Sequence, residues 1–288
     1  VLAHGPWPLA SALANLAFPW AAAAFLGRAL VAGGNRRNYF FVALLVLLGL
    51  ASGAVHLAGP LAGAALRLGL DAVLFIMSVM AGRVVPMFTN NGVPGAQATR
   101  HPWIERAALG SVLALLATSA LQLAGWTLPA PWTISLALVA ALAHGLRWWR
   151  WQPWTTAGNP LVWVLHLAYL WIPVHLLLRA GHAAGWWPPG PALHALTTGA
   201  IGLLTLAMMT RSARGHTARP LRADRVDVAS YTLVAGAALL RTVLPLMWPA
   251  ALVPAVLVSA LAWMGGWALF AWHYGPWLMR PRLDGQPG

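Results

Sequence analysis

The sequence contains no cysteine and no lysine, and only five of its 288 residues are acidic. Without cysteine the chain cannot form a disulfide, a thiolate metal site, a cysteine-ligated iron–sulfur cluster or a covalently attached c-type haem. The few acids give no support to paired-carboxylate chemistry, because none lies near another within a hydrophobic segment. Any metal site must therefore use histidine, methionine, carboxylate or backbone oxygen.

Charge of either sign is scarce, since 8% of residues are charged whereas soluble proteins carry about 25%. Hydrophobic residues make up 60% of the chain, and the mean hydropathy is +0.69. They fall in long blocks, each of which predicts a membrane-spanning helix. The net charge of +13 comes from arginines scattered between these blocks. This pattern favours membrane topology in a lipid bilayer over nucleic-acid binding.

Turn residues and charges divide the chain into nine hydrophobic segments, which predict an all-α, polytopic transmembrane bundle in a single domain over residues 1–288. The predicted spans are 9–32, 38–59, 61–87, 103–124, 132–149, 159–180, 191–210, 227–247 and 250–274.

The arginines occur in alternate connections, which the positive-inside rule assigns to the cytoplasm. With nine spans, this predicts an inner-membrane protein with Val1 on the periplasmic side and Gly288 on the cytoplasmic side. The chain opens without methionine and without a signal peptide, so we expect an N-terminal portion to be missing. The most basic connection, 208–227, carries five arginines, and we interpret most of them as topology signals.

Histidines within the spans are the candidate ligands, because a histidine in lipid is costly and usually marks a ligand, a proton relay or an interhelical hydrogen bond. Neutral imidazole suits haem iron or copper. Counting from the span ends predicts an outer layer and an inner layer. The outer layer contains His56, His175 and His194, and the inner layer contains His144, His166 and His273. His166 and His175 are nine residues apart, about 13 Å along a helix, so they cannot bind one metal ion.

Charged residues inside the spans add to this pattern. Arg67 and Asp71 have the i, i+4 spacing that places them on one helix face. We expect Arg241 or Arg67 to contact Asp71 or a cofactor carboxylate, and we count Arg241, Arg83 and Arg211 as candidate cofactor-binding residues. The segment "GRVVPMFTNNGVPG" at 82–95 contains a proline that loosens a helix, and it is read either as a helix end with a turn or as a functional loop.

Four segments together resemble the NnrS family: "GRVVPMFTNN" at 82–91, "PLVWVLHLAYLWIP" at 160–173, "LHALTTGAIGLLTLAMMTRSARGHTARPL" at 193–221 and "WHYGPWLMRPRLDG" at 272–285. The resemblance covers essentially the whole chain, although a family-like "GHTGRP" reads "GHTARP" here. Members are bacterial membrane proteins of roughly twelve helices, so this chain corresponds to about the C-terminal three quarters. The resemblance implies haem b and copper, and a role in nitric oxide response linked to denitrification.

Among the candidate metal or haem ligands we rank His194 and His166 first, then His216, with His175 and His56 as the geometric alternative. His216 is included because "GHT" in a basic connection permits a turn that aims an imidazole back at the helix ends. Structural hydrogen bonding remains the alternative role for each histidine. The alternative function is a transporter or channel with an intramembrane arginine, aspartate and histidine pathway.

Overall fold

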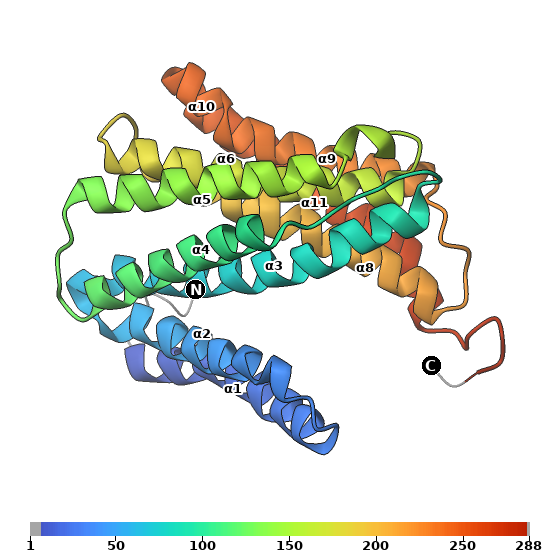
Figure 1. Cartoon of the computed structure of the whole chain (residues 1–288), viewed down its shortest axis with the longest axis horizontal. Coiled ribbons are helices and arrows are strands. Elements are labelled where there is room, and N and C mark those ends of the chain that lie inside the picture. Colours follow the sequence, from blue (N-terminus) through green and yellow to red (C-terminus); the bar gives the residue numbers. More distant parts are fainter. Residues whose placement is uncertain (1–6, 287–288) are drawn as a thin grey trace. The chain divides into compact units, whose positions relative to one another are not determined.

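The computed structural model describes residues 7–286, and each of the nine predicted spans is helical (Figure 1). The helices are α1 (Pro8–Ala32), α2 (Tyr39–Leu57), α3 (Ala62–Gly92), α4 (Pro102–Leu123), α5 (Ala130–Arg150), α6 (Pro160–Ala183), α7 (Gly190–His194), a π-helix (Ala195–Gly202), α8 (Leu203–His216), α9 (Arg225–Thr242), α10 (Leu244–Met247) and α11 (Leu252–Leu278). No strand occurs in these residues, which confirms the all-α prediction. Val1 and Gly288 lie outside the described part of the chain.

Eight of the helical stretches within residues 7–286 are long and apolar enough to cross a membrane. The stretch α5 is not among these eight, and it carries His144, Arg147 and Arg150 in its last two turns. The fold is therefore a polytopic helical membrane bundle.

The structure confirms a helix end with a turn at 82–95, although the helix ends later than the predicted span. Helix α3 continues through Pro86 to Gly92, and a turn follows at 93–95. A proline removes one backbone hydrogen bond, but helices in membranes tolerate this when neighbouring groups satisfy the freed carbonyl. As a consequence, the polar residues of this segment stand on a helix.

The chain divides into two compact units. Unit 1 consists of 1–80 and 109–136, and unit 2 of 81–108 and 137–288. In unit 1, α1 and α2 form an antiparallel hairpin (Figure 1). The buried core of unit 1 is formed by Leu44, Ala51, Leu68, Ala72 and Leu116.

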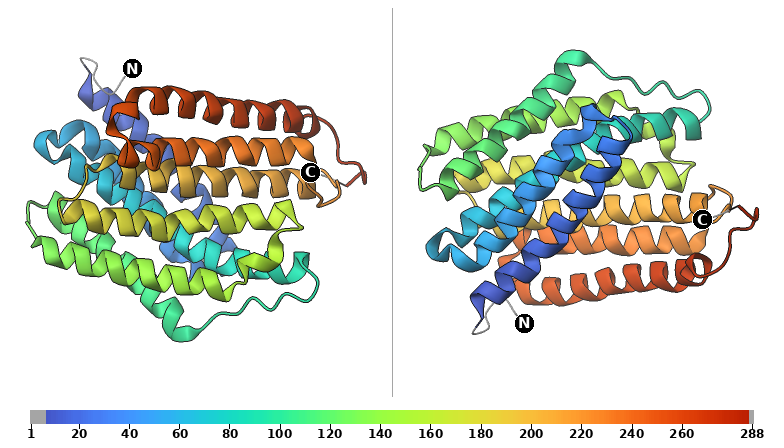
Figure 2. Two further views of the ribbon diagram at one scale, coloured as in Figure 1. Left: turned by 90° about the horizontal axis from the view of Figure 1, so that it is seen from above. Right: turned by 90° about the horizontal axis from the view of Figure 1, so that it is seen from below.

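In unit 2, α6, the stretch from the π-helix to α8, α9 and α11 lie side by side (Figure 2). Of the eight apolar stretches, α6 has the largest buried share. It carries both His166 and His175, which are 2% and 6% exposed. Side chains on its inner faces therefore meet protein rather than lipid.

Candidate functional site

The hydrogen bonds around His166 fix which ring nitrogen carries the proton. The hydroxyl of Thr89, in α3, donates to the carbonyl of Val85 (2.8 Å). Its oxygen must therefore accept from Nε2 of His166, which lies 2.8 Å away. The neutral ring then has its lone pair on Nδ1, which is buried and has no hydrogen-bond partner within the described residues. An imidazole held by a bond at one nitrogen, with a bare lone pair on the other, suits a metal ligand.

The same reasoning fixes the tautomer of His175, which lies nine residues after His166 on α6. Its Nδ1 lies 2.7 Å from the carbonyl oxygen of Ala192, in α7. A carbonyl can only accept, so Nδ1 donates and Nε2 carries the lone pair. Histidines that bind haem iron or other metals through Nε2 often donate Nδ1–H to a backbone carbonyl in this way.

His194 is the last residue of α7, and the π-helix begins immediately after it. A π-helix is rare and frequently occurs at functional sites. His194 is half-buried, and the guanidinium of Arg241, in α9, lies close enough to interact with it electrostatically. His175 donates to Ala192, which is two residues before His194. The structure thus brings His175, His194 and Arg241 to one region of unit 2.

His144 has both ring nitrogens engaged. Its Nε2 donates to the carbonyl of Ala108 (3.2 Å), and its Nδ1 accepts from the hydroxyl of Tyr169 (2.6 Å). The ring is fully buried. Binding a metal would break one of these bonds, so the structure favours the interhelical hydrogen-bonding role for this histidine.

The hydroxyl of Tyr169 also accepts from Arg147 (3.3 Å), which forms a two-point ion pair with Glu105 (2.8 and 2.5 Å). The charge pattern counts Arg147 among the topology signals, yet it is 2% exposed. A Cβ at Gly82 would overlap its guanidinium, so the glycine that opens "GRVVPMFTNN" makes room for this ion pair. The sequence analysis missed Tyr169 and Glu105, although Glu105 is one of only five acids in the chain.

The two remaining arginine candidates lie in α8 and α3. The guanidinium of Arg211, in α8, stacks 3.7 Å from the ring centre of Phe88, in α3. Arg83 is half-buried in α3. Arg211 thus has an aromatic partner that the sequence analysis did not foresee, and the cofactor-binding roles of both arginines stay predictions.

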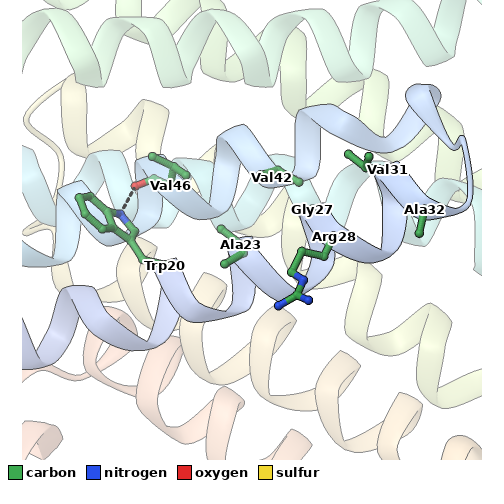
Figure 3. A pocket seen from close by; sticks show the side chains of 9 residues that line it. Trp20, Ala23, Gly27, Arg28, Val31, Ala32, Val42 and Val46 are labelled. Carbon is green, nitrogen blue, oxygen red and sulfur yellow. Dashed lines mark hydrogen bonds between the residues drawn. The ribbon is translucent and has the colours of Figure 1, made fainter.

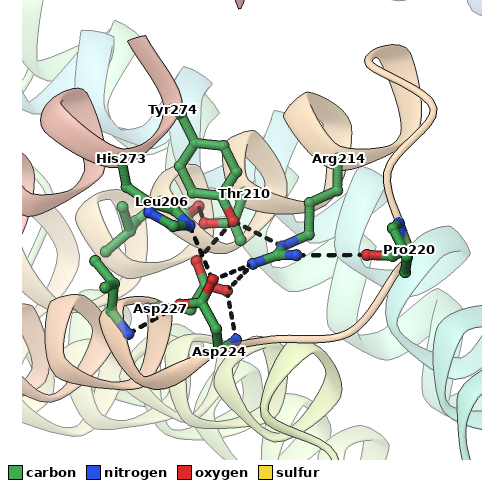
Figure 4. Close-up of polar contacts among 9 residues, drawn as sticks. Leu206, Thr210, Arg214, Pro220, Asp224, Asp227, His273 and Tyr274 are labelled. Carbon is green, nitrogen blue, oxygen red and sulfur yellow. Dashed lines mark hydrogen bonds and ion pairs between the residues drawn. The ribbon is translucent and has the colours of Figure 1, made fainter. Parts of the chain in front are cut away.

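The basic connection 208–227 contains a buried ion-pair cluster at Arg214, which is 5% exposed (Figure 4). Arg214 donates to Asp224 (2.8 Å), to Asp227 (2.6 Å) and to the hydroxyl of Tyr274 (2.8 Å). Tyr274 in turn donates to Asp227 (2.6 Å). These bonds join α8, α9 and α11, so Arg214 does more than signal topology.

The cluster at Arg214 also contains His273, whose Nε2 lies 2.8 Å from a carboxylate oxygen of Asp224. His273, Asp224 and Asp227 place possible metal-ligand atoms within 4.8 Å of one another. The guanidinium of Arg214 already donates to both carboxylates, and a cation would have to displace it. The cluster is therefore explained as an ion-pair network.

The family model described as NnrS protein matches residues 1–282. The chain belongs to the NnrS family. No curated protein and no solved structure matches it.

Two further histidine candidates of this NnrS-family chain have different surroundings. His216 is the exposed last residue of α8. His56 belongs to unit 1, where its Nε2 lies 3.1 Å from the amide nitrogen of Asn15. Because that amide nitrogen donates, Nε2 of His56 already uses its lone pair. The predicted ligand roles of both residues stay predictions.

Asp71, the acid of the third span, is buried in unit 1 and accepts a hydrogen bond from Ser119 (2.6 Å). Ser119 lies on α4, and the sequence analysis did not foresee this partner. The expected contact of Arg67 or Arg241 with Asp71 or a cofactor carboxylate stays a prediction.

Proposed function

We propose that this NnrS-family membrane protein binds haem b and copper through intramembrane histidines and acts in the response to nitric oxide, in association with denitrification. The support for haem is the family membership together with His175, whose Nδ1–H is held by the carbonyl of Ala192. This bond leaves Nε2 as the basic nitrogen on a buried helix.

The residues near His175 suit a haem group. His194 offers a second imidazole, and Arg241 offers a guanidinium for a haem carboxylate. Bound haem would supply an iron centre able to bind nitric oxide. The chain itself contributes the orientation of the histidine ring, the positive charge that attracts a carboxylate, and burial away from lipid and water.

For copper, the support is His166, because its Nδ1 is buried with a bare lone pair and no partner among the described residues. The chain has no thiolate, and imidazole is a nitrogen ligand that suits copper. Thr89 holds the ring through Nε2 and so keeps Nδ1 deprotonated.

The alternative, a polar transport pathway, has less support from the contacts in unit 2. A pathway needs polar groups that face a water-filled route. Glu105, Arg147, Tyr169 and His144 instead satisfy one another in a buried network. Such a network fixes helices relative to one another.

The proposal is tested by measuring haem and copper per polypeptide after single replacements. We expect His175→Ala to lose haem, His194→Ala to lower haem, and His166→Ala to lose copper while retaining haem. The matched control is His182→Ala, because His182 also donates Nδ1–H to a backbone carbonyl (2.9 Å) but is exposed at the end of α6. Wild-type amounts of both cofactors in all three variants would contradict the proposed ligands.

A further inference from the structure

An apolar groove of about 860 Å³ runs between α1 and α2 in unit 1 (Figure 3). It is lined by small residues of α1, including Ala24 and Gly27, and by Val42 and Val46 of α2. Trp20 stands at one end, where its indole nitrogen donates to the carbonyl of Val46 (3.2 Å). The groove is therefore shaped by the hairpin itself, with its only indole donor already satisfied.

The length of the groove matches one leaflet of a bilayer. Its lining on α1 extends from Trp20 to Ala32, which is about 18 Å along a helix. Half of the hydrocarbon core of a membrane is about 15 Å. An extended acyl chain that enters beside the end of α1 would thus reach the indole of Trp20.

The charged residues near the end of α1, where the chain turns into α2, are arginines. Arg28 is the only charged residue that lines it, and it lies about 6 Å from the end of α1. Arg36 and Arg37 follow in the short turn to α2 and are exposed. Within residues 7–286 no carboxylate pairs with Arg28, and Asp71, the acid of unit 1, is buried against Ser119. The described residues of unit 1 therefore offer Arg28 no paired carboxylate.

From this combination we infer that the α1–α2 groove is a binding site for an anionic phospholipid, with one acyl chain along the groove and the phosphate at Arg28. A guanidinium matches the geometry of a phosphate and reaches the headgroup region by snorkelling. The apolar groove binds the chain, and Arg28, assisted by Arg36 and Arg37, selects the negative headgroup. This site is independent of the haem and copper proposal.

The test is native mass spectrometry of the purified protein released from nanodiscs that contain equal amounts of phosphatidylglycerol and phosphatidylcholine. The wild type should retain phosphatidylglycerol. Arg28→Gln should reduce that retention about fivefold, the scale of one basic residue acting on an anionic lipid. The matched control is Arg280→Gln, which removes one exposed arginine from the chain after α11 and should not change retention.

A second pair of variants tests the groove without changing the charge. A Cβ at Gly27 would stand 3.7 Å from Val42, an ordinary contact, so Gly27→Ala should fold and bind lipid normally. Gly27→Leu projects further into the groove and should lower the retention of phosphatidylglycerol. Should Arg28→Gln fail to fold, Gly27→Leu decides the question. Wild-type retention in Gly27→Leu would overturn the inference, and so would a lipid-free dimer of the wild type that Gly27→Leu dissociates.

Discussion

At the scale of single residues, the candidate site depends on protons that sequence alone does not place. Hydropathy and spacing predict that His166 and His175 lie inside spans, and the structure confirms that both are buried. The ring tautomers depend on Thr89 and Ala192, which lie 77 and 17 residues away from them in sequence. Such pairings arise only when the helices pack, so a one-dimensional pattern cannot reveal them.

Thr89→Val tests the role of the threonine, because valine has the same shape but cannot accept a hydrogen bond. Without an acceptor at Nε2, the ring of His166 loses the bond that keeps Nδ1 deprotonated. We expect copper affinity to fall about 10- to 100-fold, the usual effect of removing such an outer partner. Competition titration with a copper chelator measures it. Thr118→Val, which removes a buried hydroxyl bonded only within α4, should leave copper affinity unchanged. Equal affinities in the two variants would contradict this role.

Ala218 has a backbone φ of +58°, in the left-handed region that favours glycine. It occupies the position at which the NnrS-like "GHTGRP" has glycine. Ala218→Gly should therefore stabilise the protein by about 1 kcal/mol. Unfolding in mixed detergent micelles measures this difference. The control is Ala223→Gly in the same connection, where φ is not positive and glycine should destabilise. A loss of stability in Ala218→Gly would refute the strain argument.

At the scale of elements, helix positions follow from the sequence because hydropathy is local. The irregular points within the helices do not follow from the sequence. Helix α3 passes through Pro86, and the π-helix after His194 has no sequence signal that we recognised. The positive-inside pattern likewise could not show that Arg147 and Arg214 are buried, because their acidic partners lie 42 and 10 to 13 residues away.

The start of α9 gives a pH-dependent prediction. Asp224 caps this helix and bonds to Arg214. Partial burial acts to raise the pKa of its carboxyl, but the backbone N–H of Asp227, the nearby His273 and the guanidinium of Arg214 together lower that pKa. A lowered pKa in the folded state means that the carboxylate stabilises the fold above its ordinary pKa of 3.8. This contribution disappears as the pH falls through the lowered value.

Asp224→Asn keeps a capping oxygen and removes the charge, so it isolates this contribution. Thermal melts should show the variant to be less stable than the wild type at pH 7. The difference should shrink as the pH falls below about 4 toward the lowered pKa, below which the carboxyl of the folded wild type is also neutral. A difference that stays constant from pH 7 to pH 3 would show that the charge of Asp224 contributes nothing.

At the scale of the whole molecule, the excess of arginine sets the expected orientation. The chain has a net charge of +13, and its arginine-bearing connections alternate with connections almost free of charge. Two arginines, Arg147 and Arg214, are buried in ion pairs. The remaining arginines still give more positive charge to one set of alternating connections than to the other.

Reporter fusions after Arg37, Arg150 and Arg225 test this orientation. All three should report a cytoplasmic location, and a fusion after Trp126 should report the periplasm. The readout is paired alkaline phosphatase and fluorescent protein activity, since each reporter is active on one side of the membrane only. A periplasmic signal at any of the first three positions would show that the predicted topology is wrong.

The central claim is that this chain is a haem-binding membrane protein, and the absorption spectrum of the purified full-length protein tests it most directly. After expression with an adequate haem supply, we expect a Soret band that shifts on reduction and again when nitric oxide is added. The pyridine derivative should identify haem b. A folded, monodisperse preparation without a Soret band would contradict the account.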